Sequence, residues 1–222
     1  MKNVYLLVLA LLSFSLSRAQ INKGDVLLGG NIQHTNYNQA YAPALDKENM
    51  TTVGPSFGWA VKDNLEFGTR LLYSFAKSDQ NYPSQSPPYH YTLEFTRYGL
   101  ALYIRQYKDL GHRFAIFVEG DLVGSGGRTK ITNVQVAGLF TNQKSWNIDA
   151  ALTAGIAYRV AHRWMFEAGF SSLASAGYEH IRDNGQDVTM DGASGKTSYF
   201  SLGTNFSQAL QNFSFGCRYI LN

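Results

Sequence analysis

The sequence predicts an all-β protein, an eight-strand antiparallel up-and-down transmembrane β-barrel. Several stretches alternate apolar side chains with small or polar ones, which gives each predicted strand one lipid-compatible face and one polar face. Short turns alternate with long polar connections, as in barrels whose short turns lie on the periplasmic side. The composition agrees, because 21 Gly, 14 Tyr and 14 Phe accompany only 16% charged residues, which suits a barrel with aromatic girdles.

The first 19 residues have the pattern of a secretory signal peptide. Lys2 supplies a basic start, residues 4–16 are almost wholly apolar, and Ala19 is a small residue at the expected cleavage position. We therefore divide the chain into a signal peptide, residues 1–19, and an outer-membrane β-barrel domain, residues 20–222. No other apolar run approaches the roughly 18 residues of a membrane-spanning helix.

The first predicted strand covers residues 25–35 and leads into a polar connection over residues 36–49. A hairpin follows over residues 52–75, with its turn at residues 62–64. Phe57, Trp59 and Phe67 lie on its apolar face, and Glu66 and Arg70 lie on its polar face. Residues 77–88 contain three prolines and are predicted to form a loop, because proline cannot donate to a strand ladder.

The middle hairpin joins a strand at residues 90–107 to one at residues 114–122 through a short turn at residues 108–112. The apolar alternation of its first strand changes parity near Phe95. Either a β-bulge or a change of environment above the membrane would explain this change. Residues 125–144 contain Gly and Asn and are predicted to form a loop.

The third hairpin joins residues 146–159 to residues 164–170, and residues 179–196 form a polar loop after it. The final segment, residues 197–221, is long for one membrane crossing. It is either one bulged strand or a strand with an extra small hairpin. The total of eight strands is even, which places both chain ends on the periplasmic side.

Ten charged side chains fall on the predicted interior face. They are five acids and five arginines: Glu66, Arg70, Arg97, Arg105, Glu119, Asp121, Asp149, Arg159, Glu167 and Arg218. An eight-strand barrel is only wide enough for side chains to fill, so these charges should pair, and arginine is suited to bidentate pairing with carboxylates. We expect a charge-paired, non-conducting interior; the alternative is a proton path or a narrow porin-like channel.

We expect no catalytic, cofactor or metal site. An outer-membrane lipid-modifying enzyme of the deacylase type needs a His, a Ser and an acid near the outer membrane edge. His34, His90 and His180 lie in suitable stretches, but none belongs to a His-x-Ser pattern. The Asp- and Asn-containing residues 183–187 lack the spacing of a calcium-binding EF-hand loop. A deacylase-like enzyme remains the alternative.

The chain resembles a small outer-membrane β-barrel family, porin-family-like and common in Bacteroidetes-type bacteria. The residues that carry the resemblance are Pro55, Gly58, Trp59, Asp63, Asn64, Leu65 and Gly68. Residues 103–120 and 155–167 resemble the family's second and third hairpins. The chain end resembles the signal that the barrel-assembly machinery reads, although it lacks a terminal Phe or Trp. The family implies no cofactor and no catalytic residues.

The expected location is the outer membrane of a Gram-negative bacterium, where a monomer would contact membrane lipid and lipopolysaccharide. The barrel-assembly machinery would insert it, and its outer loops would be free to bind an unknown protein. Without its signal peptide the chain has 17 basic and 16 acidic residues, so no nucleic-acid partner is expected. A soluble lipocalin-like binder shares the strand count but would have an apolar interior and a polar exterior.

Overall fold

The structure is a computed structural model that describes residues 21–41, 44–82, 89–133, 140–183, 196–204 and 213–221. The predicted signal peptide lies outside these residues. The described chain contains nine β-strands in one antiparallel sheet. They are β1 (Val26–Tyr41), β2 (Ala44–Lys62), β3 (Leu65–Tyr82), β4 (Tyr89–Gly111), β5 (Phe114–Asn133), β6 (Phe140–Arg159), β7 (Trp164–Asp183), β8 (Lys196–Thr204) and β9 (Phe213–Leu221).

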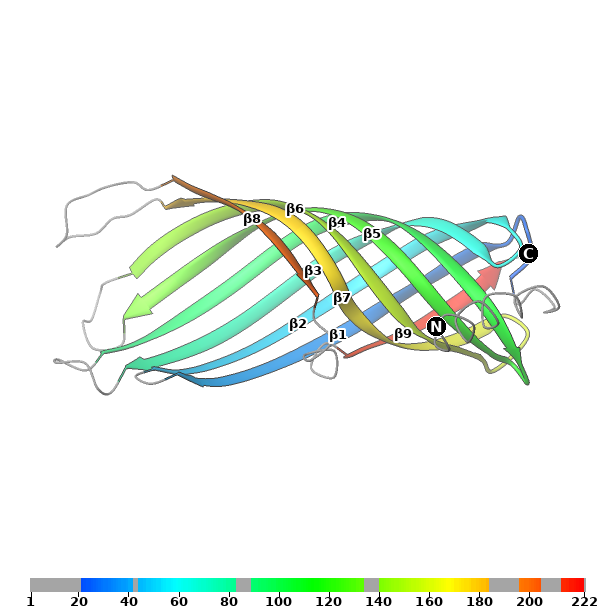
Figure 1. The fold of residues 1–222 in the computed structure, drawn as a ribbon, viewed down its shortest axis with the longest axis horizontal. Helices are drawn as coiled ribbons and strands as arrows, with labels where there is room; N and C mark the ends of the chain where they lie inside the picture. The colour runs from blue at the N-terminus through cyan, green and yellow to red at the C-terminus, as the bar shows by residue number, and fades with distance from the viewer. Residues whose placement is uncertain are drawn as a thin grey trace, which may run out of the picture.

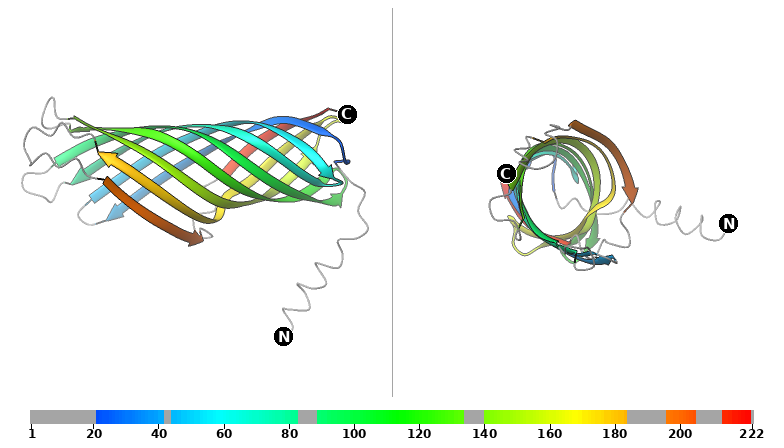
Figure 2. Two further views of the ribbon diagram at one scale, coloured as in Figure 1. Left: turned by 90° about the horizontal axis from the view of Figure 1, so that it is seen from above. Right: turned by 90° about the vertical axis from the view of Figure 1, so that its left-hand side faces the viewer.

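The sheet closes on itself as a barrel. Strands β1 to β7 pair in sequence order, and β9 pairs with both β1 and β7. On β7, residues 164–170 pair with β9 and residues 174–182 pair with β8. The strands β8 and β9 therefore share the position of an eighth strand, which confirms the predicted up-and-down barrel (Figures 1 and 2). Within the described residues, the final segment is divided into two strands that do not pair with each other.

The strands extend further than predicted at the end opposite the short turns. The described parts of the loops predicted over residues 36–49, 77–88, 125–144 and 179–196 are paired strand: residues 36–41, 44–49, 77–82, 125–133, 140–144, 179–183 and 196. For these residues the loop prediction is wrong, because polar side chains exclude a strand from lipid but not from a barrel wall that continues into water. Backbone hydrogen bonds between neighbouring strands form equally well there. The rest of the predicted loops, residues 42–43, 83–88, 134–139 and 184–195, lies outside the described chain.

No β-bulge accounts for the parity change in β4. The pairing of β4 with β3 and with β5 runs without a register shift past Phe95. Phe95 therefore lies on the same inward face as Arg97 and Tyr103. The apolar side of the strand changes from inward to outward where the strand enters the membrane, so the change of environment is the correct explanation.

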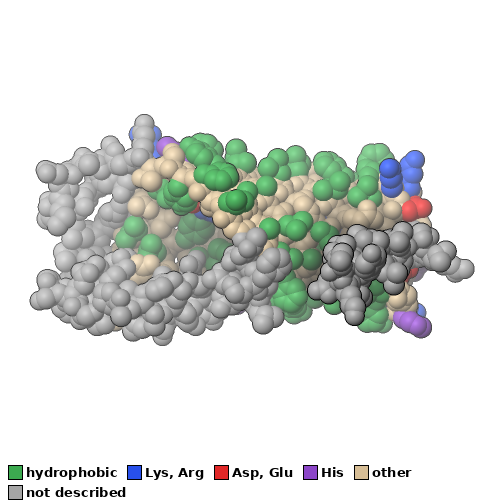
Figure 3. All heavy atoms as spheres, viewed as in Figure 1, with side chains coloured by type: hydrophobic (Ala, Val, Ile, Leu, Met, Phe, Trp, Pro, Cys, Tyr) green, Lys and Arg blue, Asp and Glu red, His purple; other side chains and the backbone are tan. Residues whose placement is uncertain are grey.

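Apolar side chains cover much of the described outer surface (Figure 3), and aromatic girdles bound this belt at both ends. Ring pairs mark both girdles: Phe114–Tyr158 and Trp164–Tyr219 near the short turns, and Tyr73–Tyr98 and Trp146–Tyr178 towards the other end. On β6, Tyr158 and Trp146 are twelve residues apart, or about 40 Å along the strand. With the usual strand tilt this is roughly 30 Å along the barrel axis, the thickness of a bilayer's hydrocarbon core.

Most large apolar side chains of the barrel wall face outward, and the charged side chains of the buried ion pairs face inward. Trp59 on the outer face is 55% exposed, whereas Glu66 on the inner face is fully buried. This polarity is the reverse of what a lipocalin-like binder requires. No helix in the described part of the chain is long and apolar enough to cross a membrane.

Candidate functional site

The short-turn end of the interior is filled by an apolar cluster. Ile21 precedes β1 and lies fully buried, with its carbonyl accepting a 2.9 Å hydrogen bond from the backbone N–H of Asn64 in the β2–β3 turn. Asn64 has a φ of 60°, a conformation that Asn tolerates better than most residues. The other members of the cluster are Leu27, Ala60, Tyr107, Ala115, Phe117, Ala157, Met165 and Ile220. The cluster packs residues from most of the strands against the N-terminal segment.

A layer of buried ion pairs lies next to the apolar cluster. The Nε and Nη1 atoms of Arg105 donate to Glu119 at 2.7 Å and to Glu167 at 2.6 Å. Arg218 forms an ion pair with Glu66. The Nε atom of Arg218 also lies 2.8 Å from a Glu167 oxygen, an ion pair in which the N–H direction does not suit a hydrogen bond. All five side chains are less than 9% exposed. Buried charges of this kind are tolerated only when they are paired.

Two tyrosines tie the carboxylates together. Tyr103 donates to Glu66 at 2.6 Å. Tyr107 lies 3.0 Å from oxygens of both Glu66 and Glu167. The Arg105 guanidinium also lies 4.3 Å from the centre of the Phe117 ring, a cation–π distance. Each carboxylate therefore has several partners within the layer.

Glycines in β2 and β3 make room for this layer. Gly58 and Gly68 lie directly opposite each other. A Cβ atom at Gly68 would stand 2.5 Å from the Tyr103 hydroxyl and 2.5 Å from the Phe57 carbonyl oxygen. A Cβ atom at Gly58 would overlap the Glu66 carboxylate. The missing side chains allow Tyr103 to reach Glu66.

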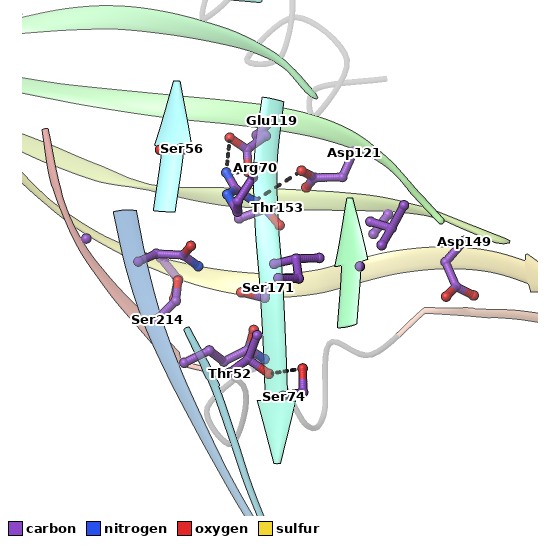
Figure 4. A pocket seen from close by; sticks show the side chains of 18 of the residues that line it. Thr52, Ser56, Arg70, Ser74, Glu119, Asp121, Asp149, Thr153, Ser171 and Ser214 are labelled. Carbon is purple, nitrogen blue, oxygen red and sulfur yellow. Dashed lines mark hydrogen bonds and ion pairs between the residues drawn. The ribbon is translucent and has the colours of Figure 1, made fainter. Parts of the chain in front are cut away.

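Arg70 forms the boundary between the ion-pair layer and an open space above it. It donates to Glu119 at 2.9 Å and to Asp121 at 3.2 Å (Figure 4). A cavity of about 330 Å³ lies above these residues and is partly open. Further along, Arg97 donates to Glu179 at 2.9 Å, and Glu179 accepts a 2.5 Å hydrogen bond from a tyrosine of β8.

The ten predicted interior charges divide into three groups. Seven form the connected network: Glu66, Arg70, Arg105, Glu119, Asp121, Glu167 and Arg218. Arg97 and Asp149 lie outside this network and line the cavity, as six of the seven network residues also do. Arg159 faces inward near the short turns. Among the described residues, no carboxylate forms an ion pair with Arg159 within 4 Å.

Sequence reasoning missed Tyr103, Tyr107, Glu179 and Tyr199 as members of these networks. The two β4 tyrosines share the parity of Arg105, which was a usable signal. Glu179 fell in a predicted loop, so its inward direction had no basis in the sequence. Tyr199 lies in β8, whose pairing with β7 brings it to Glu179.

His34 and His180 lie on the outward face of β1 and β7. His34 Nδ1 is 3.0 Å from the Thr51 hydroxyl, and His180 Nδ1 is 2.8 Å from the Ser198 hydroxyl. The His180–Ser198 pair joins β7 to β8 and was not anticipated. No carboxylate hydrogen-bonds either ring in the described residues. Nor does that part of the chain contain a group of three or more His, Cys, Asp or Glu that could hold a metal.

The chain resembles solved structures in fold, at low sequence identity. No protein-family model and no curated protein matches the chain. The outer membrane protein OprG from Pseudomonas aeruginosa shares 13% identity and a TM-score of 0.47, over 92% of this chain and 100% of that one. Ail of Yersinia pestis shares 12% identity and a TM-score of 0.43, over 90% and 99%.

Neisserial surface protein A shares 15% identity with the chain and a TM-score of 0.41, over 89% of this chain and 99% of that one. These likenesses are weak, and the barrel architecture is established by the strand pairing of this chain itself.

The interior of the barrel consists of three zones: an apolar cluster, an ion-pair layer and a polar cavity.

Proposed function

We propose that this protein is a non-enzymatic barrel of the Gram-negative outer membrane that does not conduct and acts through its outer end. Its task there would be interaction, adhesion or envelope integrity. A monomer would contact lipid and lipopolysaccharide, be inserted by the barrel-assembly machinery, and present its outer loops to a protein partner. The observation that carries the proposal is the double closure of the bore by the apolar cluster and the ion-pair layer.

The closure argues against the alternative of a narrow channel. A permeating ion would have to pass buried arginines and glutamates that are already paired at 2.6 to 2.9 Å. It would then have to cross the apolar cluster, where Ile21, Leu27 and Met165 have no exposed surface. Neither zone offers an ion a replacement for its hydration shell, and the cost of stripping charges of water is high.

Planar-bilayer recordings test this closure. The folded protein should show no discrete conductance steps, whereas an open porin inserted into the same bilayer should show them. Regular steps that scale with salt concentration would contradict the proposal and favour the channel.

Among the residues that the structure describes, the His180–Ser198 pair is the observation that favours an enzyme. A serine nucleophile needs a base that is itself oriented by a third group, commonly a carboxylate. None is present around this pair in the described residues. We therefore expect no hydrolysis of lipopolysaccharide or phospholipid by the purified protein, and no change on Ser198→Ala. Hydrolysis that disappears in Ser198→Ala but persists in the neighbouring control Ser201→Ala would establish the enzyme instead.

A further inference from the structure

The cavity above the ion-pair layer has the size of a small ligand site. Its volume of about 330 Å³ lies at the lower end of the roughly 300–1,000 Å³ typical of ligand pockets. Arg70 and Asp121 contribute to its floor, and Thr52 and Ser74 lie further along the wall (Figure 4). Because the opposite end of the bore is filled, a ligand would enter from the outer end.

Eight side chains of the cavity lining carry a hydroxyl group. They are Thr52, Ser56, Ser74, Ser125, Thr153, Ser171, Ser175 and Ser214. Thr52 and Ser74 bond to each other at 2.8 Å. By contrast, no side-chain hydrogen bond within the described chain engages Ser56, Thr153, Ser171 or Ser175. These four hydroxyls are free to donate to and accept from a ligand.

All but one of the charges around the cavity have an ion-pair partner. The exception among the described residues is Asp149, whose carboxylate accepts a hydrogen bond from the Asn147 amide. Four arginines and four acids line it: Arg70, Arg97, Arg105, Arg218, Glu119, Asp121, Asp149 and Glu167. Arg70 is held by Glu119 and Asp121, and Arg97 is held by Glu179. An anionic ligand would have to displace one of these carboxylates from its arginine, so the lining disfavours an anion.

Among the described residues, three buried polar atoms of lining side chains have no hydrogen-bond partner. They are the acceptor Asn31 Oδ1 and the donors Arg97 Nε and Arg218 Nε, the last of which lies in an ion pair with Glu167. These atoms have almost no accessible surface, so a ligand would meet the four free hydroxyls and not these atoms. Phe95 and Leu72 also line the cavity and offer apolar surface to C–H groups.

We infer that this cavity is a binding site for a neutral, polyhydroxylated ligand of mono- or disaccharide size. A sugar supplies neighbouring hydroxyls that suit the free hydroxyls of the lining, carries no charge, and presents C–H groups to the apolar wall. The sugar site lies in the outer half of the barrel interior, so sugar binding can be tested independently of ion conduction. A conducting barrel would refute the closure without touching the sugar site.

The test is a titration of the mature chain with glucose and maltose in a sugar-free zwitterionic detergent, because maltoside detergents would compete. Saturation-transfer NMR should detect saturable binding of one or both sugars, and glucuronate should bind more weakly. Thr153→Val removes one cavity hydroxyl with little change of shape and should weaken binding about fivefold, the effect of losing one neutral hydrogen bond. Thr69→Val makes the same change on the outward face of β3 and should have no effect.

Three outcomes would overturn the inference. Absence of saturable binding to the wild-type protein would mean that the cavity holds only water. Tighter binding of glucuronate than of glucose would identify an anion site. Equal weakening by Thr153→Val and Thr69→Val would place the sugar outside the cavity. Ser171→Ala provides a second variant should Thr153→Val fail to fold, with the same expected direction.

Discussion

Arg105→Met should lower the free energy of unfolding by about 3–5 kcal/mol, the usual cost of breaking a buried ion pair. The arginine is 4% exposed and binds Glu119 and Glu167. Methionine occupies a similar space but leaves both carboxylates short of positive charge where each is less than 9% exposed. The measurement is the urea midpoint of the folded protein in lipid vesicles, followed by gel mobility or tryptophan fluorescence.

Two further variants separate lost charge from lost packing. Arg159→Met makes the same substitution at an inward-facing arginine without an ion pair within 4 Å among the described residues, and it should cost under about 1 kcal/mol. The double variant Arg105→Met with Glu167→Gln removes one charge of each sign and should recover part of the loss, because uncompensated charge is the main penalty. No recovery in the double variant would show that the arginine acts by packing alone.

Gly68→Ala should destabilise the barrel by about 1–3 kcal/mol, the range for overpacking a well-filled interior. The new methyl group would stand 2.5 Å from the Phe57 carbonyl oxygen, which is backbone and cannot rotate away. It would also press on Tyr103, whose hydroxyl bonds Glu66 at 2.6 Å. The same urea titration measures the effect.

Gly124→Ala is the matched control, because nothing lies within 4 Å of the added Cβ at this outward-facing position of β5. Replacing glycine there restricts only the unfolded chain, so we expect a change between zero and about 1 kcal/mol in favour of folding. If Gly68→Ala behaved like Gly124→Ala, the close packing of Tyr103 on β3 would not be the reason for the glycine.

Period-two alternation was sufficient to predict the two faces of most strands. In β2 and β3 the outward Phe57, Trp59 and Phe67 and the inward Glu66 and Arg70 lie as expected. The alternation is local, since successive side chains on a strand point to opposite sides. It therefore needs no knowledge of the neighbouring strands.

Strand ends were harder to predict than strand faces. Residues 36–41 have polar side chains and no apolar alternation, yet they pair with β2 throughout. Whether a polar segment is a strand or a loop depends on whether a neighbour is present to pair with it. That information belongs to the fold and not to the segment.

The sequence by itself determined that the chain is a barrel with charged side chains inside, because alternation and turn length are local properties of the chain. It also marked Gly58 and Gly68 through a family motif, without a reason for them. Only the tertiary structure decided which charges meet, because Arg218 and Glu66 are 152 residues apart and come together through barrel closure. The reason for the glycines, the apolar cluster at the short-turn end and the cavity above the ion-pair layer all follow from the closure of the sheet into a barrel.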